Sequence, residues 1–270
     1  VGFQPDLQVL SGRSISSAKI AYDAVRGAGS DKMLTWNTTS VEGTDSGSNG
    51  SQYGFLSAFN SDAFVLTDGS TNGAWVNNNT STYVSWNWLA GNATLGTGDF
   101  TQGSLASTCS RNVDAGFSVV SYTGTGSATT VGHGLSQAPD LIIVKRLNGP
   151  TDWITYHSAN TSAPETDYLI LNTTDATTDG STSWNDTAPT SSVFSVGNRD
   201  ATNSSSNGMI AYCFHSVDGY SKFGSYIGNG SADGTFINCG FTPAWVCVKR
   251  TDSTASWEQV DNKRTNQTNP

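Results

Sequence analysis

The sequence predicts an all-β protein built from tandem β-sandwich units, with very little helix. Charged residues make up only 13% of the chain, and uncharged polar, aromatic and β-branched residues take their place. Such a mixture suits half-buried strands and their turns. Short apolar runs are separated by turn pairs such as Asp179-Gly180 and Asn207-Gly208. The third observation is a set of motifs that recur at a constant separation.

The clearest recurrence joins the middle of the chain to its last part. Ser121–Ser127 (SYTGTGS) is followed 104 residues later by Ser225–Ser231 (SYIGNGS). The same separation relates Pro139 to Pro243, Val144–Arg146 to Val248–Arg250, and Trp153 to Trp257. Several matches at one separation indicate a duplicated structural unit.

A more divergent copy lies upstream. Pro5–Leu7 matches Pro139–Leu141, and Tyr22 matches Tyr156, both at a separation of 134 residues. We therefore expect a first unit at 1–91 without its opening strand, a linker at 92–113, a second unit at 114–218, and the start of a third unit at 219–270. Either the sequence is an excerpt of a longer chain, or a neighbouring molecule supplies the missing strands.

The second unit shows its expected strands in order. Phe117–Tyr122 alternates and ends at glycines, while Leu141–Lys145 and Met209–Phe214 are apolar runs suited to central strands. About six short strands in roughly 100 residues are typical of a β-sandwich. Further strands are expected at Trp153–His157, Tyr168–Leu171 and Ser192–Val196, and Phe223–Ile227 should open the third unit. Only Ser17–Val25 has a pattern that could give a turn or two of helix.

Charge and cysteine content exclude several classes of partner. The net charge of −9 argues against nucleic acid, because phosphate binding needs a basic surface. No stretch of 18 apolar residues occurs, so no membrane span is expected. The four cysteines lack C-x-x-C spacing, which argues against a zinc site. Buried thiols are the simpler interpretation, and one disulfide, between Cys213 and Cys239, stays open.

Five strings in the chain form a distinctive set: Asp114–Gly126 (DAGFSVVSYTGTG), Val131–Leu135 (VGHGL), Trp184–Phe194 (WNDTAPTSSVF), Ala211–Phe214 (AYCF) and Gly219–Tyr226 (GYSKFGSY). Together they resemble a repeat family of virion appendage proteins from marine bacteriophages, cyanophages included. The resemblance covers nearly the whole chain, although Gln8–Gly12 departs from the pattern of the later copies. It implies a lectin-like (concanavalin A-like) or jelly-roll sandwich and a place on the virion surface. Its implied partners are other copies of the chain in a homo-oligomer and other virion proteins.

Aromatic side chains are the candidates for a binding role, because apolar ring faces stack on sugars when they are exposed. Trp75 and Trp184 lie in polar, turn-rich stretches and are the predicted carbohydrate-binding residues. Trp153 and Trp257 recur at matching positions, which favours a structural role. Trp86 and Trp88 alternate in one strand and should both point inward.

No pattern typical of catalysis stands out, and we expect the protein not to be an enzyme. The chain has no Gly-x-Ser-x-Gly motif, and its glutamates are too few to suggest a glycosidase pair. His133 should cap a turn or lie at the surface, and His215 should be structural. No cofactor is expected; Ca²⁺ at Asp175, Asp179 and Asp186 stays open, although hairpin turns explain these residues more simply.

These expectations combine into a non-catalytic structural protein of a phage virion surface, such as a tail fibre, a spike or a head-decoration protein. It would contact the host surface or a glycan, with no nucleic acid or membrane as partner. Two alternatives stay open: a secreted bacterial carbohydrate-binding module, and an extracellular filament whose subunits exchange strands. Each places the protein on the virion surface or outside the cell.

Overall fold

A computed structural model describes residues 1–91 and 93–264, and these residues are mostly strand, turn and loop. The helical elements among them are α1 (Gly50–Tyr53), α2 (Asp200–Asn203) and the 3-10 turn η1 (Pro164–Thr166). No helix in this described part of the chain is long and apolar enough to cross a bilayer. The predicted all-β class is confirmed.

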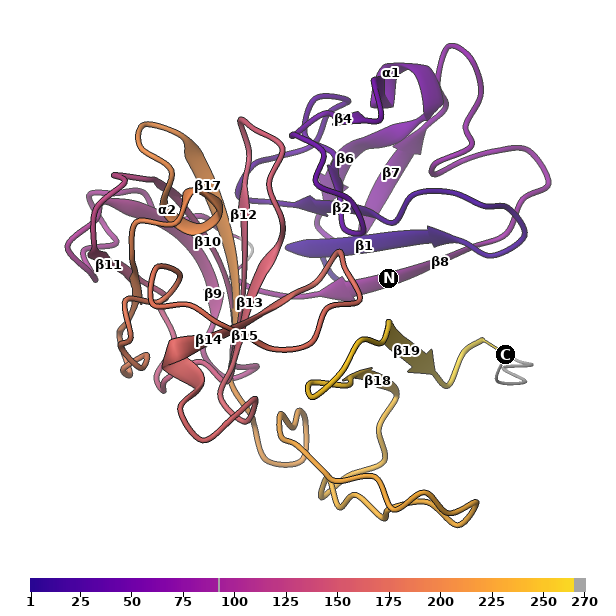
Figure 1. Ribbon diagram of the computed structural model, residues 1–270. Helices are drawn as coiled ribbons and strands as arrows, with labels where there is room; N and C mark the ends of the chain where they lie inside the picture. The colour runs from indigo at the N-terminus through magenta and orange to yellow at the C-terminus, as the bar shows by residue number, and fades with distance from the viewer. Residues whose placement is uncertain (92, 265–270) are drawn as a thin grey trace.

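The first sheet has the strand order β3-β2-β1-β8, with every neighbouring pair antiparallel (Figure 1). The hairpin of β6 and β7 covers one face of it, which we call the outer face. Leu10, Ile20, Tyr22 and Leu56 are buried between the two layers. The elements are β1 (Leu7–Gly12), β2 (Ile20–Asp23), β3 (Leu34–Thr35), β4 (Thr44–Asp45), β5 (Ser48–Asn49), β6 (Phe55–Asn60), β7 (Ala63–Thr67) and β8 (Tyr83–Trp88).

The second sheet has seven antiparallel strands in the order β15-β14-β13-β12-β17-β10-β9. The pair β11–β16 lies over its outer face, where Val131 and Phe194 pack with Val120 and Ile142. Two packed layers around one core make this part a β-sandwich. The strands are β9 (Ser107–Asn112), β10 (Phe117–Thr123), β11 (Thr129–Gly132), β12 (Leu141–Arg146), β13 (Ile154–His157), β14 (Asp167–Ile170), β15 (Thr178–Asp179), β16 (Val193–Val196) and β17 (Gly208–Phe214).

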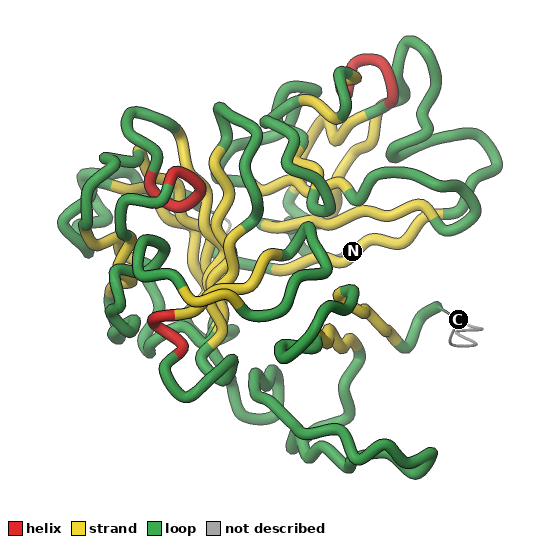
Figure 2. Tube along the Cα trace, viewed as in Figure 1, coloured by secondary structure: helices red, strands yellow, loops and turns green. Residues whose placement is uncertain are grey.

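The third sheet is the hairpin of β18 (Trp245–Lys249) and β19 (Trp257–Asp261), which lies near the C-terminus in Figure 1. The chain between β17 and β18 is loop, apart from one bridge between Val217 and Ser221 (Figure 2). The strand expected at Phe223–Ile227 is therefore not formed. An extended segment becomes a strand only when a neighbour satisfies its backbone groups, and no described strand lies beside this one.

Two further expectations are wrong. Ser17–Val25 contains strand β2 instead of a helical turn, because Ile20 and Tyr22 face one core and Ala21 faces another, which is the period of a strand. The predicted linker at 92–113 contains β9, which extends the second sheet. Cys109 of β9 is buried in the core of the sandwich, so this segment is part of the sandwich and not a connector.

The inner faces of the first two sheets share one hydrophobic cluster, which we call the central core. Val9 of the first sheet and Ile143 and Tyr212 of the second belong to it, and Trp257 of the third sheet packs against it. Trp86 and Trp88 also pack against the central core, as their alternation predicted. The sheets are therefore joined through a common interior.

We call β1–β2, β12–β13 and β18–β19 the first, second and third hairpin, and their strands pair in the same register. The pairs at their open ends are, in chain order, Leu7 with Asp23, Leu141 with His157, and Trp245 with Asp261. These pairs are separated by 134 and 104 residues, which are the separations of the sequence matches. The strand beyond the hairpin also corresponds, since β8 lies beside β1 as β17 lies beside β12.

Candidate functional site

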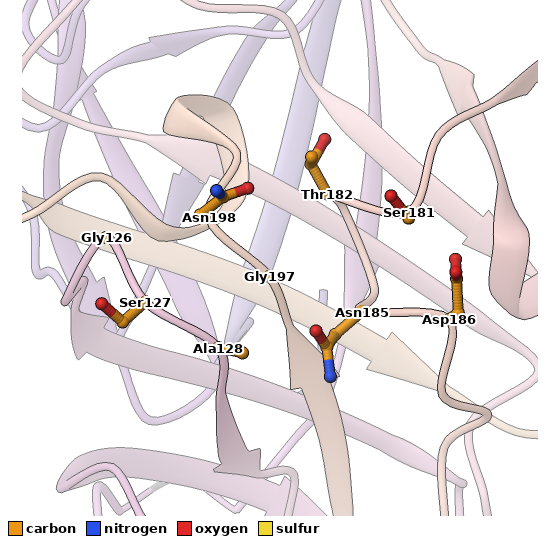
Figure 3. Close-up of a pocket in the computed structure, with 9 residues that line it drawn as sticks. All are labelled: Gly126, Ser127, Ala128, Ser181, Thr182, Asn185, Asp186, Gly197 and Asn198. Carbon is orange, nitrogen blue, oxygen red and sulfur yellow. The ribbon is translucent and has the colours of Figure 1, made fainter.

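Three loops of the second sandwich border an open, shallow pocket of about 450 Å³ (Figure 3). One loop follows β10, one follows β15 and one follows β16, so strands far apart in the sequence bring them together. The lining residues are Gly126, Ser127, Ala128, Ser181, Thr182, Asn185, Asp186, Gly197 and Asn198. We call this the loop pocket.

A buried asparagine fixes two of the three loops. Asn203 is fully buried, and its side-chain nitrogen donates to the carbonyl oxygens of Ser127 at 2.7 Å and Gly197 at 2.6 Å. Its side-chain oxygen accepts from the backbone N–H of Thr125 at 2.7 Å. Because buried amides are costly to leave unpaired, these bonds hold the loops in one arrangement.

The third loop is held by close backbone packing. Gly197 donates its N–H to the carbonyl of Ser183 at 3.1 Å, and a Cβ on Gly197 would lie 2.4 Å from the carbonyl oxygen of Thr182. Only glycine allows this approach. Asn185 and Asp186 both have positive φ values, 55° and 45°, a region that Asn and Asp tolerate better than most residues.

The loop pocket presents hydroxyl and amide groups with a single carboxylate, that of Asp186. One carboxylate without a second acid or a base offers no acid–base pair of the kind that hydrolysis of a sugar bond requires. Hydroxyls, amides and one acid can instead exchange hydrogen bonds with a polar, uncharged ligand. The lining therefore offers hydrogen-bond donors and acceptors to such a ligand.

The two predicted sugar-stacking tryptophans do not offer exposed ring faces. Trp184 is 1% exposed, and its ring packs edge-on against Tyr156 with centroids 5.9 Å apart. Trp75 is 8% exposed and packs on Tyr53 at 5.2 Å. A large apolar ring stabilises the fold when it is removed from water, and it contributes no such stabilisation when it is exposed. Both rings are therefore packed in hydrophobic cores. Trp184 precedes the pocket residue Asn185 in the chain but is not one of the residues that line the pocket, and it is not a stacking platform.

Apart from Asp186, which the sequence offered as a calcium candidate, the loop-pocket residues were not singled out as site residues. Ser127 and Asn198 are separated by 71 positions, and each lies in an ordinary polar turn. The glycines at 126 and 197 were the one local signal, because isolated glycines between strands mark close backbone approaches.

His133 is buried and not at the surface, although its turn-capping role is confirmed. Its Nδ1 accepts from the N–H of Leu135 at 3.2 Å, and its Nε2 lies 3.1 Å from the carbonyl of Thr190. Nε2 must therefore carry the proton and donate it. Burial lowers the pKa of His133 to about 4, which keeps the ring neutral. His215 is also buried, as its predicted structural role requires.

The cysteines and the candidate calcium residues form no joint site in the structure. All four cysteines are free, with Cys109 and Cys213 buried, so the disulfide between Cys213 and Cys239 is not formed. Among residues 1–91 and 93–264, no cluster of three His, Cys, Asp or Glu side chains is arranged to hold a metal ion. Asp175 accepts a hydrogen bond from the Thr173 hydroxyl at 2.9 Å, which is a local turn contact.

A buried polar network that the sequence did not suggest joins the first two sheets. Arg26 donates to Asp23 at 2.6 Å and to Glu42 at 2.9 Å, and the Tyr212 hydroxyl donates to the same Asp23 carboxylate at 2.8 Å. Burial, and then the charge of Asp23, raise the pKa of Tyr212, so the phenol keeps its proton as a donor. Asp23 and Arg26 are 0% and 4% exposed, and the network is therefore a structural join.

A family model described as a domain of unknown function (DUF7483) matches residues 1–270. No curated protein matches the chain, and no solved structure matches it either.

Proposed function

We propose that this chain, which belongs to the DUF7483 family, is a non-catalytic structural protein that is displayed on the surface of a phage virion. The observation that carries the proposal is the central core shared by the three sheets. Hairpins of one register packed on a common interior give a rigid body, which suits presentation of a surface. The motifs that resemble virion appendage proteins supply the location.

The three hairpins are, in this proposal, copies of one structural unit. Their common register supports this, together with the corresponding positions of β8 and β17. The second copy then extends over residues 107–214 and includes β9, and the third copy consists of the hairpin at residues 245–261 with the loop before it.

The loop pocket is the proposed point of contact with a host-surface glycan. Its uncharged hydroxyl and amide groups match the hydrogen-bonding capacity of sugar hydroxyls, and the buried Asn203 keeps them in place before the ligand arrives. Because no exposed aromatic ring lines the pocket, affinity should come from hydrogen bonds and should be modest for a single site.

Immunogold labelling of purified particles tests the location. Antibodies against the 270-residue chain should label the particle surface. If the protein is found only in particle-free medium, the virion assignment is wrong and the secreted binding module takes its place.

A glycan array probed with the purified chain tests the loop pocket. The double variant Ser127→Ala, Asn198→Ala should lose the binding that the wild-type chain shows. Asn60→Ala, at an exposed position on β6 far from the pocket in the sequence, serves as the matched control and should bind normally. Equal binding by the double variant would remove the pocket from the proposal.

A further inference from the structure

One turn in the wall of the loop pocket carries two successive non-glycine residues with positive φ. Thr187 donates its N–H to the carbonyl of Trp184 at 3.2 Å, and this bond closes the turn around Asn185 and Asp186. Two positive φ values in the middle of such a turn are typical of type I′, whose second central residue is usually glycine. Asp186 therefore occupies a position where the backbone alone favours glycine, and a side chain kept in such a position points to a role in binding.

The side chains of this turn line the loop pocket and are not used by the fold. Asn185 and Asp186 are exposed, and neither side chain makes a hydrogen bond or an ion pair within the described residues. The side chains of Ser127, Ser181 and Asn198 are exposed and unpaired within the same residues. Figure 3 shows Asp186 on one side of the pocket and Ser127 and Asn198 on the other. Hydroxyl, amide and carboxylate groups on both sides are therefore available to a ligand.

The charge of the pocket has one sign. Asp186 is charged, and none of the described residues that line the pocket is a lysine or an arginine. Arg199 follows the pocket residue Asn198 in the chain, but its guanidinium carbon lies 4.2 Å from the ring centroid of Tyr168, on which it stacks. An acidic ligand would bring its own negative charge beside Asp186 with no cation in the lining to balance the two.

We propose that the loop pocket selects neutral sugars over acidic ones, and that Asp186 sets this preference by accepting hydrogen bonds from two neighbouring sugar hydroxyls. A carboxylate accepts at two adjacent oxygens, and its hydrogen bonds are stronger than those between neutral groups. The amide of Asn185, the neighbouring residue in the turn, donates to the oxygen of one of these hydroxyls. Such a preference presupposes the glycan contact proposed above and names the class of sugar that the site takes.

Matched pairs of methyl glycosides are the probes. Each pair consists of a neutral hexopyranoside and the uronic acid of the same configuration, so that a hydroxymethyl group is exchanged for a carboxylate and nothing else changes. Saturation-transfer NMR with the 270-residue chain suits the weak binding expected of an open pocket without an aromatic platform. At low salt the neutral member should bind at least about fivefold more tightly, and this ratio should shrink at high salt because salt screens the repulsion.

Deoxy derivatives of the tightest-binding neutral glycoside test the pair of hydroxyls. Removal of either of two neighbouring hydroxyls should weaken binding, because one oxygen of the Asp186 carboxylate then loses its donor. Removal of a hydroxyl elsewhere on the ring should have little effect. A series in which no two neighbouring hydroxyls matter would overturn the proposed contact.

Two variants separate the charge of the pocket from its fold. Asp186→Asn keeps the shape of the side chain, and it should weaken neutral-sugar binding by about fivefold and abolish the preference over the uronic acid. Asp179→Asn is the matched control, because Asp179 is also exposed and close in sequence but does not line the pocket. Asn185→Gly should unfold at about the same urea concentration as the wild-type chain, since glycine suits a positive φ, but should bind sugar more weakly.

The outcomes distinguish the preference from the glycan contact itself. Equal affinity for the neutral and acidic members of the pairs overturns the preference, and so does an unchanged preference in Asp186→Asn. Wild-type affinity of Asn185→Gly removes the amide from the contact. In each of these cases the glycan contact stands if the double variant Ser127→Ala, Asn198→Ala loses binding on the array. If no glycoside binds, the preference is wrong, and if the array is blank as well, the glycan contact is wrong with it.

Discussion

Trp257 donates its indole N–H to the carbonyl oxygen of Ile170, and this bond fixes the third hairpin on the second sheet. A different contact joins the third hairpin to the first sheet, where Trp86 donates to Asp261 at 3.3 Å. It corresponds to the bond from Tyr212 to Asp23 between the second and first sheets. The second sheet thus contacts the first, the third sheet contacts the second, and the first sheet contacts the third. These contacts surround the central core.

Replacing Trp153 by phenylalanine should destabilise the fold strongly. The variant removes the indole N–H that donates to the buried carbonyl of Thr35 and shortens a fully buried side chain, at a cost of about 2–4 kcal/mol. Trp257→Phe removes the corresponding bond at a half-buried position and is the matched control, with a smaller loss. Urea unfolding measures both. Equal losses of unfolding free energy in the two variants would mean that the burial of Trp153 in the central core adds no stability beyond that of the hydrogen bond.

Arg26→Met should cost about 3–5 kcal/mol of unfolding free energy, because it leaves the buried Asp23 carboxylate without its cation. Arg250→Met removes an exposed ion pair with Asp252, with both side chains more than half exposed, and should change stability little. Thermal unfolding of the two variants side by side makes the comparison. A small effect of Arg26→Met would show that the network is dispensable for joining the sheets.

His133 should make the fold sensitive to acid. The unfolded chain takes up a proton near pH 6.5, but the folded chain resists it until about pH 4, so stability falls as the pH drops through this window. In His133→Asn, the side-chain oxygen can accept from Leu135 but cannot titrate. The difference in unfolding free energy between wild type and variant should therefore shrink between pH 7 and pH 5. A constant difference would contradict the assignment.

Gly197→Ala should damage both the fold and the loop pocket. Its Cβ would lie 2.4 Å from the backbone oxygen of Thr182, so one loop must move, at a cost of about 1–3 kcal/mol. Gly234→Ala is the control, since a Cβ there meets nothing within 4 Å. Unfolding curves test the stability. A fully stable Gly197→Ala variant would show that the loop is not held as the structure indicates.

Thiol reactivity should separate the cysteines. Cys109 is buried, and burial raises its pKa to about 12, so it should react with a thiol reagent only after unfolding. Cys213 is buried as well, while Cys239 is partly exposed and should react first. All four thiols should be titrated in denaturant without reductant. A shortfall of two would indicate the disulfide that the structure does not contain.

Local alternation and short apolar runs were sufficient to place most strands of the second sandwich. The alternating segment Phe117–Tyr122 lies within β10, and the apolar run Leu141–Lys145 lies within β12, because both patterns are visible in the sequence itself. The separations of 134 and 104 residues between matching motifs could also be read from the sequence. Trp75 and Trp184 were misassigned as exposed because their polar sequence neighbours do not reveal which other parts of the chain pack over these rings in the folded protein.

The sequence by itself determined the all-β class, the positions of most strands in the second sheet and the recurrence of motifs at constant separations, since each follows from patterns within a few residues or from direct repetition. Only the tertiary structure decided that the hairpins share a central core and that Asn203 holds distant turns together beside a pocket. Those features depend on which surfaces meet after folding. Burial and pairing over long separations are properties of the packed chain and not of any one segment.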